Sequence, residues 1–384
     1  MQKLLSRLEG DRGIWISVIL LLLISLLAIY SSTSTLAQRF QGGNTEHYLL
    51  KHTILLIVGL AVIYFSHKLD YRFFARISPF LLGISVLLSA YTLLQGEESA
   101  INSANRWINI FGQSFQPSDL SKFSLMVYLA LVLTRKQEDI HDFKKGFLPV
   151  IGVVMLLIVF IAPADLSTAV LMFLSASMLM FVAGVRLRFI GSLFIAGAIG
   201  LLLLFMFAPR VGTWMSRLDD YGERLTSTRY EASYQTQQSN IAIASGGLTG
   251  VGAGKSVQRN YLPQPYSDFI YAIIIEEYGM FGGLFVLLLY LVILMRSVAI
   301  ITFSKTFGAL LAMGLSFLLV LQAIINMGVT TGLLPVTGLP LPLISLGGTS
   351  MLFTCLAFGV ILSVSREARP DDKPTRFSHQ PIGA

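Results

Sequence analysis

Ionisable side chains in apolar stretches are the first sign of chemistry in this 384-residue chain. Lys122, Asp165, Glu276 and Glu277 lie in or near apolar runs, where an unpaired charge costs about 2.5–3.5 kcal/mol or more in a bilayer. A further acid, Asp268, stands directly before a long apolar run. Each of these residues therefore needs either a partner or a chemical task.

Two roles are open for Asp268. An acid at the start of a helix commonly caps it by accepting hydrogen bonds from backbone amides. The same carboxylate, at a boundary between loop and membrane, also has the chemistry of a general base. The helix N-terminus favours its ionised form, whereas apolar surroundings favour the neutral acid. Because these effects oppose each other, both roles stay open at this point.

Two roles are also open for the adjacent acids Glu276 and Glu277. If they continue the helix that Asp268 begins, a rise of about 1.5 Å per residue puts them about 12 Å below it. Lys122 is the nearest partner by type, so one hypothesis is an ion pair that locks helices together. The other is a polar cavity that serves a substrate, a metal or a gate.

A glycine-rich segment, GLTGVGAGKS, precedes these acids. A phosphate-binding loop of the form GxxxxGK[ST] needs glycine at the position that Thr249 occupies, so a nucleotide site is not expected. Its glycines are expected to permit tight turns and close backbone approach. The alternative is a set of backbone amides that face an anionic ligand.

The elements that position these residues are long apolar segments. The chain is 54% hydrophobic and 13% charged, about half the charged fraction of a soluble domain. This composition predicts an all-α polytopic membrane protein of about ten transmembrane helices. The predicted spans are 14–35, 49–66, 76–94, 118–134, 147–163, 166–184, 188–208, 268–295, 307–330 and 347–365.

The distribution of lysine and arginine predicts the orientation. Eighteen of them fall in segments on the N-terminal side and three in short segments on the other side, which places both termini in the cytoplasm. The long segment 209–267, between spans seven and eight, is then outside. Residues 1–366 form one transmembrane domain, and the polar tail 367–384 is expected to be disordered. The basic residues behind the net charge of +7 serve mostly to set the orientation in the membrane, so no nucleic-acid partner is expected.

An outward-facing site has no ATP, so synthesis there requires a substrate that arrives activated. A lipid-linked pyrophosphate sugar meets this requirement and presents its reactive carbon at the membrane surface. Its leaving group needs positive charge, for which Arg217, Arg224 and Lys255 are candidates.

Five motifs, in this order on a ten-span scaffold, resemble the SEDS family of FtsW and RodA proteins. The resemblance covers most of the chain and favours the division branch, FtsW, over the elongation branch, RodA. The motifs are Arg106-Trp107 followed by FQPSDLSK, ADLSTA at 164–169, YQTQQSNIAIASGGLTGVGAGKS at 234–256, YLPQPYSDFIYAIIIEEYG at 261–279 and GLLPVTGLPLPLISLGGTS at 332–350.

The resemblance implies a peptidoglycan glycosyltransferase that polymerises lipid II on the outer face of the bacterial cytoplasmic membrane, at the division septum. It implies Asp268 as the catalytic acid and as a metal ligand, with Mg²⁺ or Mn²⁺ as cofactor and no nucleotide. The implied partners are a class B penicillin-binding protein transpeptidase and other divisome membrane proteins. Two alternatives stay open: a lipid II flippase, and a non-catalytic scaffold for the transpeptidase.

The candidate substrate-binding or cavity residues lie in or near these motifs. They are Arg106, Trp107, Asp119, Lys122, Asp165, Arg217, Gln238, Ser239, Lys255, Ser256, Glu276 and Glu277. The chain departs from the family pattern at Gln264, Asp119 and Ser167, where the family commonly has Glu, Glu and Gly. The first departure argues against acid-base work by Gln264.

Overall fold

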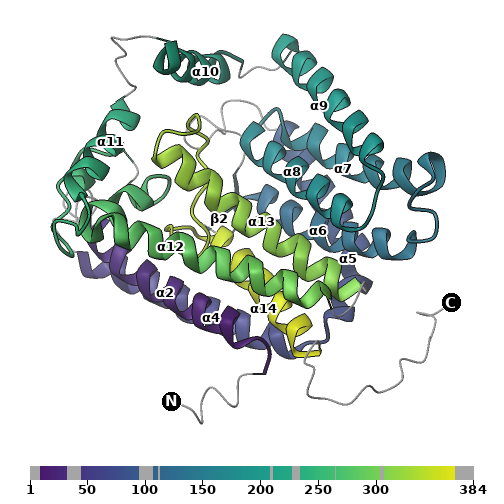
Figure 1. The fold of residues 1–384 in the computed structure, drawn as a ribbon, viewed down its shortest axis with the longest axis horizontal. Coiled ribbons are helices and arrows are strands. Elements are labelled where there is room, and N and C mark those ends of the chain that lie inside the picture. The colour runs from purple at the N-terminus through teal and green to yellow at the C-terminus, as the bar shows by residue number, and fades with distance from the viewer. Residues whose placement is uncertain are drawn as a thin grey trace.

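The computed structural model describes residues 9–32, 45–94, 107–110, 113–207, 211–226, 234–263, 265–302 and 307–367 (Figure 1). The predicted site residue Arg106 and the predicted tail beyond Glu367 lie outside these ranges.

Each of the ten predicted spans overlaps a helix in the described part of the chain. Seven helices there are long and apolar enough to cross a bilayer, and α8 and α9 contribute shorter apolar stretches. The protein is therefore a helical membrane protein. The helices that match the predicted spans are α2 (Arg12–Ser32), α4 (Thr45–Lys68), α5 (Tyr71–Leu94), α6 (Pro117–Arg135), α7 (Leu148–Ile161), α8 (Leu166–Val182), α9 (Leu187–Phe207), α12 (Ile270–Thr302), α13 (Phe307–Thr330) and α14 (Thr349–Glu367).

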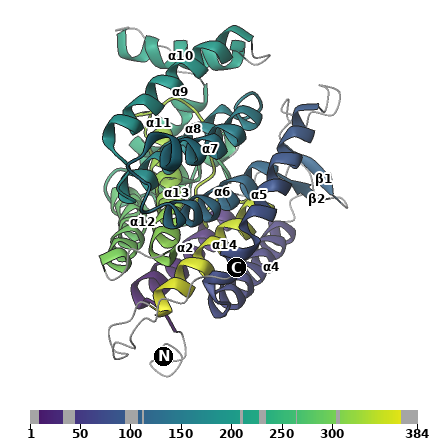
Figure 2. The same ribbon diagram turned by 90° about the vertical axis from the view of Figure 1, so that its right-hand side faces the viewer.

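The prediction of an all-α fold needs one amendment. Strands β1 (Ile108–Ile110) and β2 (Gln113–Phe115) pair antiparallel in a short hairpin before α6. The long segment before α12 also contains regular structure. It holds helices α10 (Val211–Thr226) and α11 (Tyr234–Gly246) and the short 3-10 helix η3 (Gln258–Asn260), and α10 lies at one extreme of the molecule in both views (Figures 1 and 2).

Two helix starts follow the expected chemistry. Pro117 occupies the first turn of α6, with Asp119 in the same turn, where proline loses no hydrogen bond and an acid meets the positive end of the helix dipole. The Oδ1 atom of Asp165 accepts a hydrogen bond from the backbone N–H of Thr168 at 3.1 Å and so caps α8. This cap separates α7 from α8 at the predicted boundary.

One end of the bundle is tied together by charged side chains. Asp11, before α2, accepts from Arg296 Nε of α12 at 2.9 Å, and its backbone N–H donates to Ser365 Oγ of α14 at 2.9 Å. Arg366 pairs with Glu9 at 3.4 Å. The start of α2 and the end of α14 therefore lie at the same end of the molecule.

Helix α13 lies at the centre of the bundle. It packs against α6, α8, α12 and α14, and most of its residues are buried, including Ser316, Gln322 and Asn326. Figure 1 shows α13 crossing the molecule between α12 and α8. Polar side chains on this helix can therefore reach several neighbouring elements at once.

Helix α12 is bent sharply at Gly279, whose φ of 71° and ψ of −174° are not helical. A Cβ at Gly283 would lie 3.1 Å from the Tyr271 hydroxyl and 2.8 Å from Ile275 Cγ1. In a straight helix, residues 271 and 283 would be about 18 Å apart along the axis. The segment 270–278 is therefore a short helix that packs back against the long helix 280–302.

The glycine-rich loop holds this bend in place. The backbone N–H groups of Val251 and Gly252 donate to the carbonyls of Glu276 and Glu277 at 2.9 and 3.0 Å. A Cβ at Gly250, where φ is +82°, would stand 2.2 Å from the Glu277 carbonyl oxygen. The expectation of close backbone approach is confirmed for Gly246 and Gly250, and it is not met at Gly247 and Gly254, where nothing lies within 4 Å of a Cβ.

Gly250→Ala should therefore destabilise the protein more than Gly254→Ala. Both residues have positive φ, but nothing lies within 4 Å of a Cβ at Gly254, so alanine there costs only the strain of about 1–2 kcal/mol. Thermal unfolding in detergent should show a clearly lower midpoint for Gly250→Ala. Equal midpoints would mean that the loop does not press against the bend.

Candidate active site

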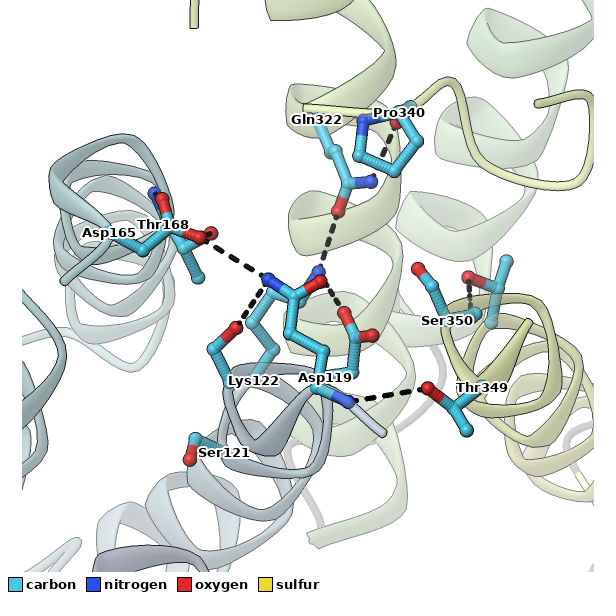
Figure 3. Close-up of polar contacts among 12 residues, drawn as sticks. Asp119, Ser121, Lys122, Asp165, Thr168, Gln322, Pro340, Thr349 and Ser350 are labelled. Carbon is cyan, nitrogen blue, oxygen red and sulfur yellow. Dashed lines mark hydrogen bonds and ion pairs between the residues drawn. The ribbon is translucent and has the colours of Figure 1, made fainter. Parts of the chain in front are cut away.

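A buried ion pair lies on α6 at the centre of the bundle (Figure 3). Lys122 Nζ is 2.8 Å from Asp119 Oδ1, and the two side chains are 9% and 3% exposed. Lys122 also donates to Gln322 Oε1 of α13 at 3.2 Å. The hypothesis that Lys122 pairs with Glu276 or Glu277 is wrong, since a carboxylate three residues away on its own helix is closer.

Gln116 joins this centre to two further helices. Its Nε2 donates to Asp165 Oδ2 at 3.3 Å and to Ser118 Oγ at 2.9 Å, and its backbone N–H donates to Thr349 Oγ1 at 3.4 Å. Asp165 is thereby tied to the start of α6 as well as capping α8. Gln116 was not predicted as a site residue, although it stands in the FQPSDLSK motif next to Pro117.

A small, partly open cavity lies beside the ion pair between α6, α13 and α14. The second oxygen of Asp119, Oδ2, is buried without a hydrogen-bond partner among the described residues, and Figure 3 shows it on the side that faces α14. The cavity is lined by Asp119, Lys122, Phe123, Leu315, Leu318, Leu319, Gln322, Ser350, Phe353, Thr354 and Ala357. Glu276 and Glu277, which were expected to line this cavity with Lys122, do not.

Asp268 lies two residues before α12 and is half-buried. Ser267 Oγ donates to its Oδ1 at 3.0 Å, and Asn326 Nδ2 of α13 donates to its backbone carbonyl at 2.9 Å. Ser345 Oγ donates to the carbonyl of Ser267 at 2.6 Å. A Cβ at Gly338 would come within 3.7 Å of Asp268 Oδ2. Side chains of two other elements therefore hold the backbone that carries this carboxylate.

Glu276 and Glu277 are both 1% exposed and are bound by hydrogen-bond donors of the glycine-rich loop and α2. Glu276 accepts from Ser256 Oγ and from the backbone N–H groups of Val257 and Gln258, the latter two at 2.9 and 3.2 Å. Glu277 accepts from Ser31 Oγ and, at 3.3 Å, from the backbone N–H of Ser256. The two acids lock elements together, but through hydrogen bonds instead of the expected ion pair with Lys122.

The direction of the short helix 270–278 also corrects the expected depth of these acids. Glu277 reaches Ser31 near the last residue of α2, whereas Asp11 and Arg296 meet at the opposite end of that helix. Asp268 is bound by Asn326, one turn before the end of α13. The Glu277–Ser31 and Asp268–Asn326 contacts both lie toward the end of the bundle that holds the glycine-rich loop, so the short helix 270–278 does not carry the two glutamates down from Asp268 toward the Asp11 end.

The other predicted site residues occupy different positions. Ser239 of α11 is buried and donates to the carbonyl of Thr330 at 2.8 Å, so it ties α11 to α13. Ser256 is buried between the two glutamates. The remaining described ones are half-buried Trp107 before β1, half-buried Gln238 on α11, exposed Arg217 on α10 and exposed Lys255 in the glycine-rich loop.

The buried ion pair generates a prediction about stability. Removing one partner leaves an uncompensated buried charge, which typically costs about 3–5 kcal/mol. Asp119→Leu and Lys122→Met should each lower the unfolding midpoint in detergent, and the double variant should lose much less than the sum of the two. Additive losses would contradict the pairing.

The chain has extensive similarity to proteins of known families. A family model described as the FtsW/RodA/SpoVE cell cycle protein matches residues 11–370. Stage V sporulation protein E of Bacillus subtilis is 34% identical over 372 residues, which are 95% of this chain and 99% of that protein. A probable peptidoglycan glycosyltransferase FtsW of Coxiella burnetii is 37% identical over 365 residues, 93% of this chain and 96% of its own length.

Solved structures share the fold. A chain of a peptidoglycan synthase complex superposes with a TM-score of 0.72 at 24% identity, covering 94% of this chain and 99% of its own. The rod shape determining protein RodA of Thermus thermophilus gives 0.67 at 23% identity, covering 95% and 100%. The sequence matches and this shared fold agree that the chain belongs to the FtsW/RodA/SpoVE family.

Proposed function

We propose that this protein is a peptidoglycan glycosyltransferase that polymerises lipid II at the outer face of the cytoplasmic membrane during cell division. The observation that carries the proposal is the half-buried residue Asp268, whose backbone, with that of Ser267, is held by Asn326 of α13 and by Ser345 of the segment 338–345. Relatives that bear the name probable peptidoglycan glycosyltransferase FtsW support the reaction class.

The orientation of the chain is part of the proposal. The excess of basic residues on the N-terminal side favours a cytoplasmic location for both termini. The contacts of Asp11 with Arg296 and Ser365, which join the start of α2 to the end of α14, support a common side for them. Asp268 lies toward the other end of the bundle. There it meets a substrate whose lipid tail stays in the bilayer and whose pyrophosphate supplies the activation.

The chemistry assigned to Asp268 is general base catalysis. Its carboxylate accepts the proton of the acceptor sugar's 4-hydroxyl while that oxygen attacks the anomeric carbon of the donor. The bond between that carbon and the pyrophosphate oxygen breaks, with inversion, and polyprenyl pyrophosphate leaves. Ser267 donates to one carboxylate oxygen, Oδ1, and so orients the group toward the acceptor.

A divalent cation fits this site in one binding mode. No three His, Cys, Asp or Glu residues converge within the described ranges, whereas Mg²⁺ is commonly held by one or two carboxylates together with substrate phosphates and waters. Asp268 is the carboxylate that would hold it. A bound cation would offset the charge that develops on the leaving pyrophosphate. The exposed side chains of Arg217 and Lys255 are further sources of positive charge.

A class B penicillin-binding protein and other divisome membrane proteins are the proposed partners. The structural similarity to a chain of a peptidoglycan synthase complex supports assembly with a second enzyme, and the FtsW-named relatives support a role at the septum.

Asp268→Asn should abolish glycan formation from lipid II by the purified protein, because the amide cannot accept the proton. Its unfolding midpoint should stay close to that of the wild type. Asp219→Asn, an exposed acid on α10, is the matched control and should stay active. Full activity of Asp268→Asn would remove the residue from the chemistry, and lipid II translocation across vesicles without glycan extension would favour a flippase.

Removal of divalent cations should lower the polymerisation rate by about 10-fold or more, since the leaving group loses its counter-charge. The measurement is the initial rate with EDTA, with Mg²⁺-saturated EDTA as control, and after addition of excess Mg²⁺ or Mn²⁺. An unchanged rate in EDTA would contradict the cation requirement.

A further inference from the structure

Two buried amide side chains on α13 face the irregular backbone around Asp268. Gln322 and Asn326 are one helical turn apart and are 3% and 1% exposed. Gln322 Nε2 donates to the carbonyl of Pro340 at 2.8 Å. Asn326 Nδ2 donates to two carbonyls, those of Leu339 at 2.8 Å and Asp268 at 2.9 Å.

The orientation of both amides follows from their partners. A lysine ammonium only donates and a backbone carbonyl only accepts. Because Lys122 Nζ donates to Gln322 Oε1, the NH₂ group of Gln322 must face Pro340, as Figure 3 shows. The two carbonyls beside Asn326 likewise require its NH₂ group, and its Oδ1 has no hydrogen-bond partner in the described part of the chain. Asn326 therefore acts here as a donor.

The backbone that receives these bonds has little regular structure of its own. Between α13 and α14 the chain has positive φ at Gly332, Gly338 and Leu343. Its Ser345 side chain accepts from Leu341 N–H at 2.8 Å and donates to the carbonyl of Ser267. Irregular backbone inside a membrane protein needs such partners, because no lipid group can replace them.

We infer that Gln322 and Asn326 are positioning residues for Asp268. Asn326 fixes the Asp268 backbone directly. Gln322 fixes the neighbouring segment 338–345, and the Lys122–Asp119 pair sets the orientation of the Gln322 amide. The buried ion pair thus acts on Asp268 through a relay of hydrogen bonds across α13. This inference rests on the proposed function, because it assigns the relay to the same reaction.

The relay gives the buried Lys122–Asp119 pair a role in the reaction, although neither residue contacts Asp268 in the described hydrogen bonds. Misplacing a catalytic group by about 1 Å can cost about 10²-fold in rate, even when the substrate still binds. Loss of either amide should therefore lower kcat far more than it changes KM. A residue that only stabilises the fold would lower the amount of folded protein, so kcat calculated per folded molecule would stay at the wild-type value.

The test compares Asn326→Leu and Gln322→Met with the control Ser316→Ala in steady-state polymerisation of lipid II. Both test substitutions keep approximate volume and remove the donor. Ser316 lies buried on the same helix and shares a hydrogen bond with Ser297 at 2.6 Å, far from Asp268 in the chain of contacts. We expect kcat to fall about 10-fold or more, with KM within about 2-fold, for the two amide variants only.

One further variant separates loss of the hydrogen-bond donor from loss of side-chain packing. Asn326→Ser retains one donor and should recover part of kcat. If Asn326→Leu does not fold, Gln322→Met, which removes one hydrogen bond to Pro340 and one from Lys122, decides alone. Wild-type kcat in the amide variants while Asp268→Asn is inactive would overturn the relay only; an active Asp268→Asn would overturn the proposed function.

Discussion

This structure depends on one constraint. Inside an apolar bundle, the backbone N–H and carbonyl groups of irregular segments must find hydrogen-bond partners within the protein. In lipid, each unpaired backbone N–H or carbonyl costs several kcal/mol. Asp268 stands between two irregular segments, and side chains supply the missing partners. Asn326 and Ser345 donate to backbone carbonyls at Asp268 and Ser267, and the carboxylates of Glu276 and Glu277 accept from the backbone N–H groups of Val257 and Ser256.

The same constraint separates two kinds of buried acid. Glu276 and Glu277 are surrounded by hydrogen-bond donors, and their hydrogen bonds join α12 to α2 and to the glycine-rich loop. Asp268 is only half-buried. A carboxylate that exchanges a proton with substrate must be reachable from outside the protein. A carboxylate that only holds helices together through hydrogen bonds can be fully buried. The division of roles therefore follows from burial and hydrogen bonding together.

The helices could be predicted from the sequence because an apolar run long enough to cross the bilayer is typical of a transmembrane helix. The bend at Gly279 was missed, since one glycine in an apolar run is ordinary and the loop that presses on it lies about 30 residues earlier. The Lys122–Asp119 pair had a local signal, because residues three apart share a helix face. Gln322 and Asn326 had none, since their partners lie 13 to 200 residues away in the chain.

The central claim is that Asp268 faces the outside at the lipid boundary. The natural cysteine, Cys355, is buried, so Asp268→Cys can be labelled selectively after Cys355→Ala. The most direct measurement is the reaction of this variant with a membrane-impermeant maleimide on intact spheroplasts. The account predicts labelling from the outside. Labelling that appears only after the cytoplasmic face is opened would contradict it.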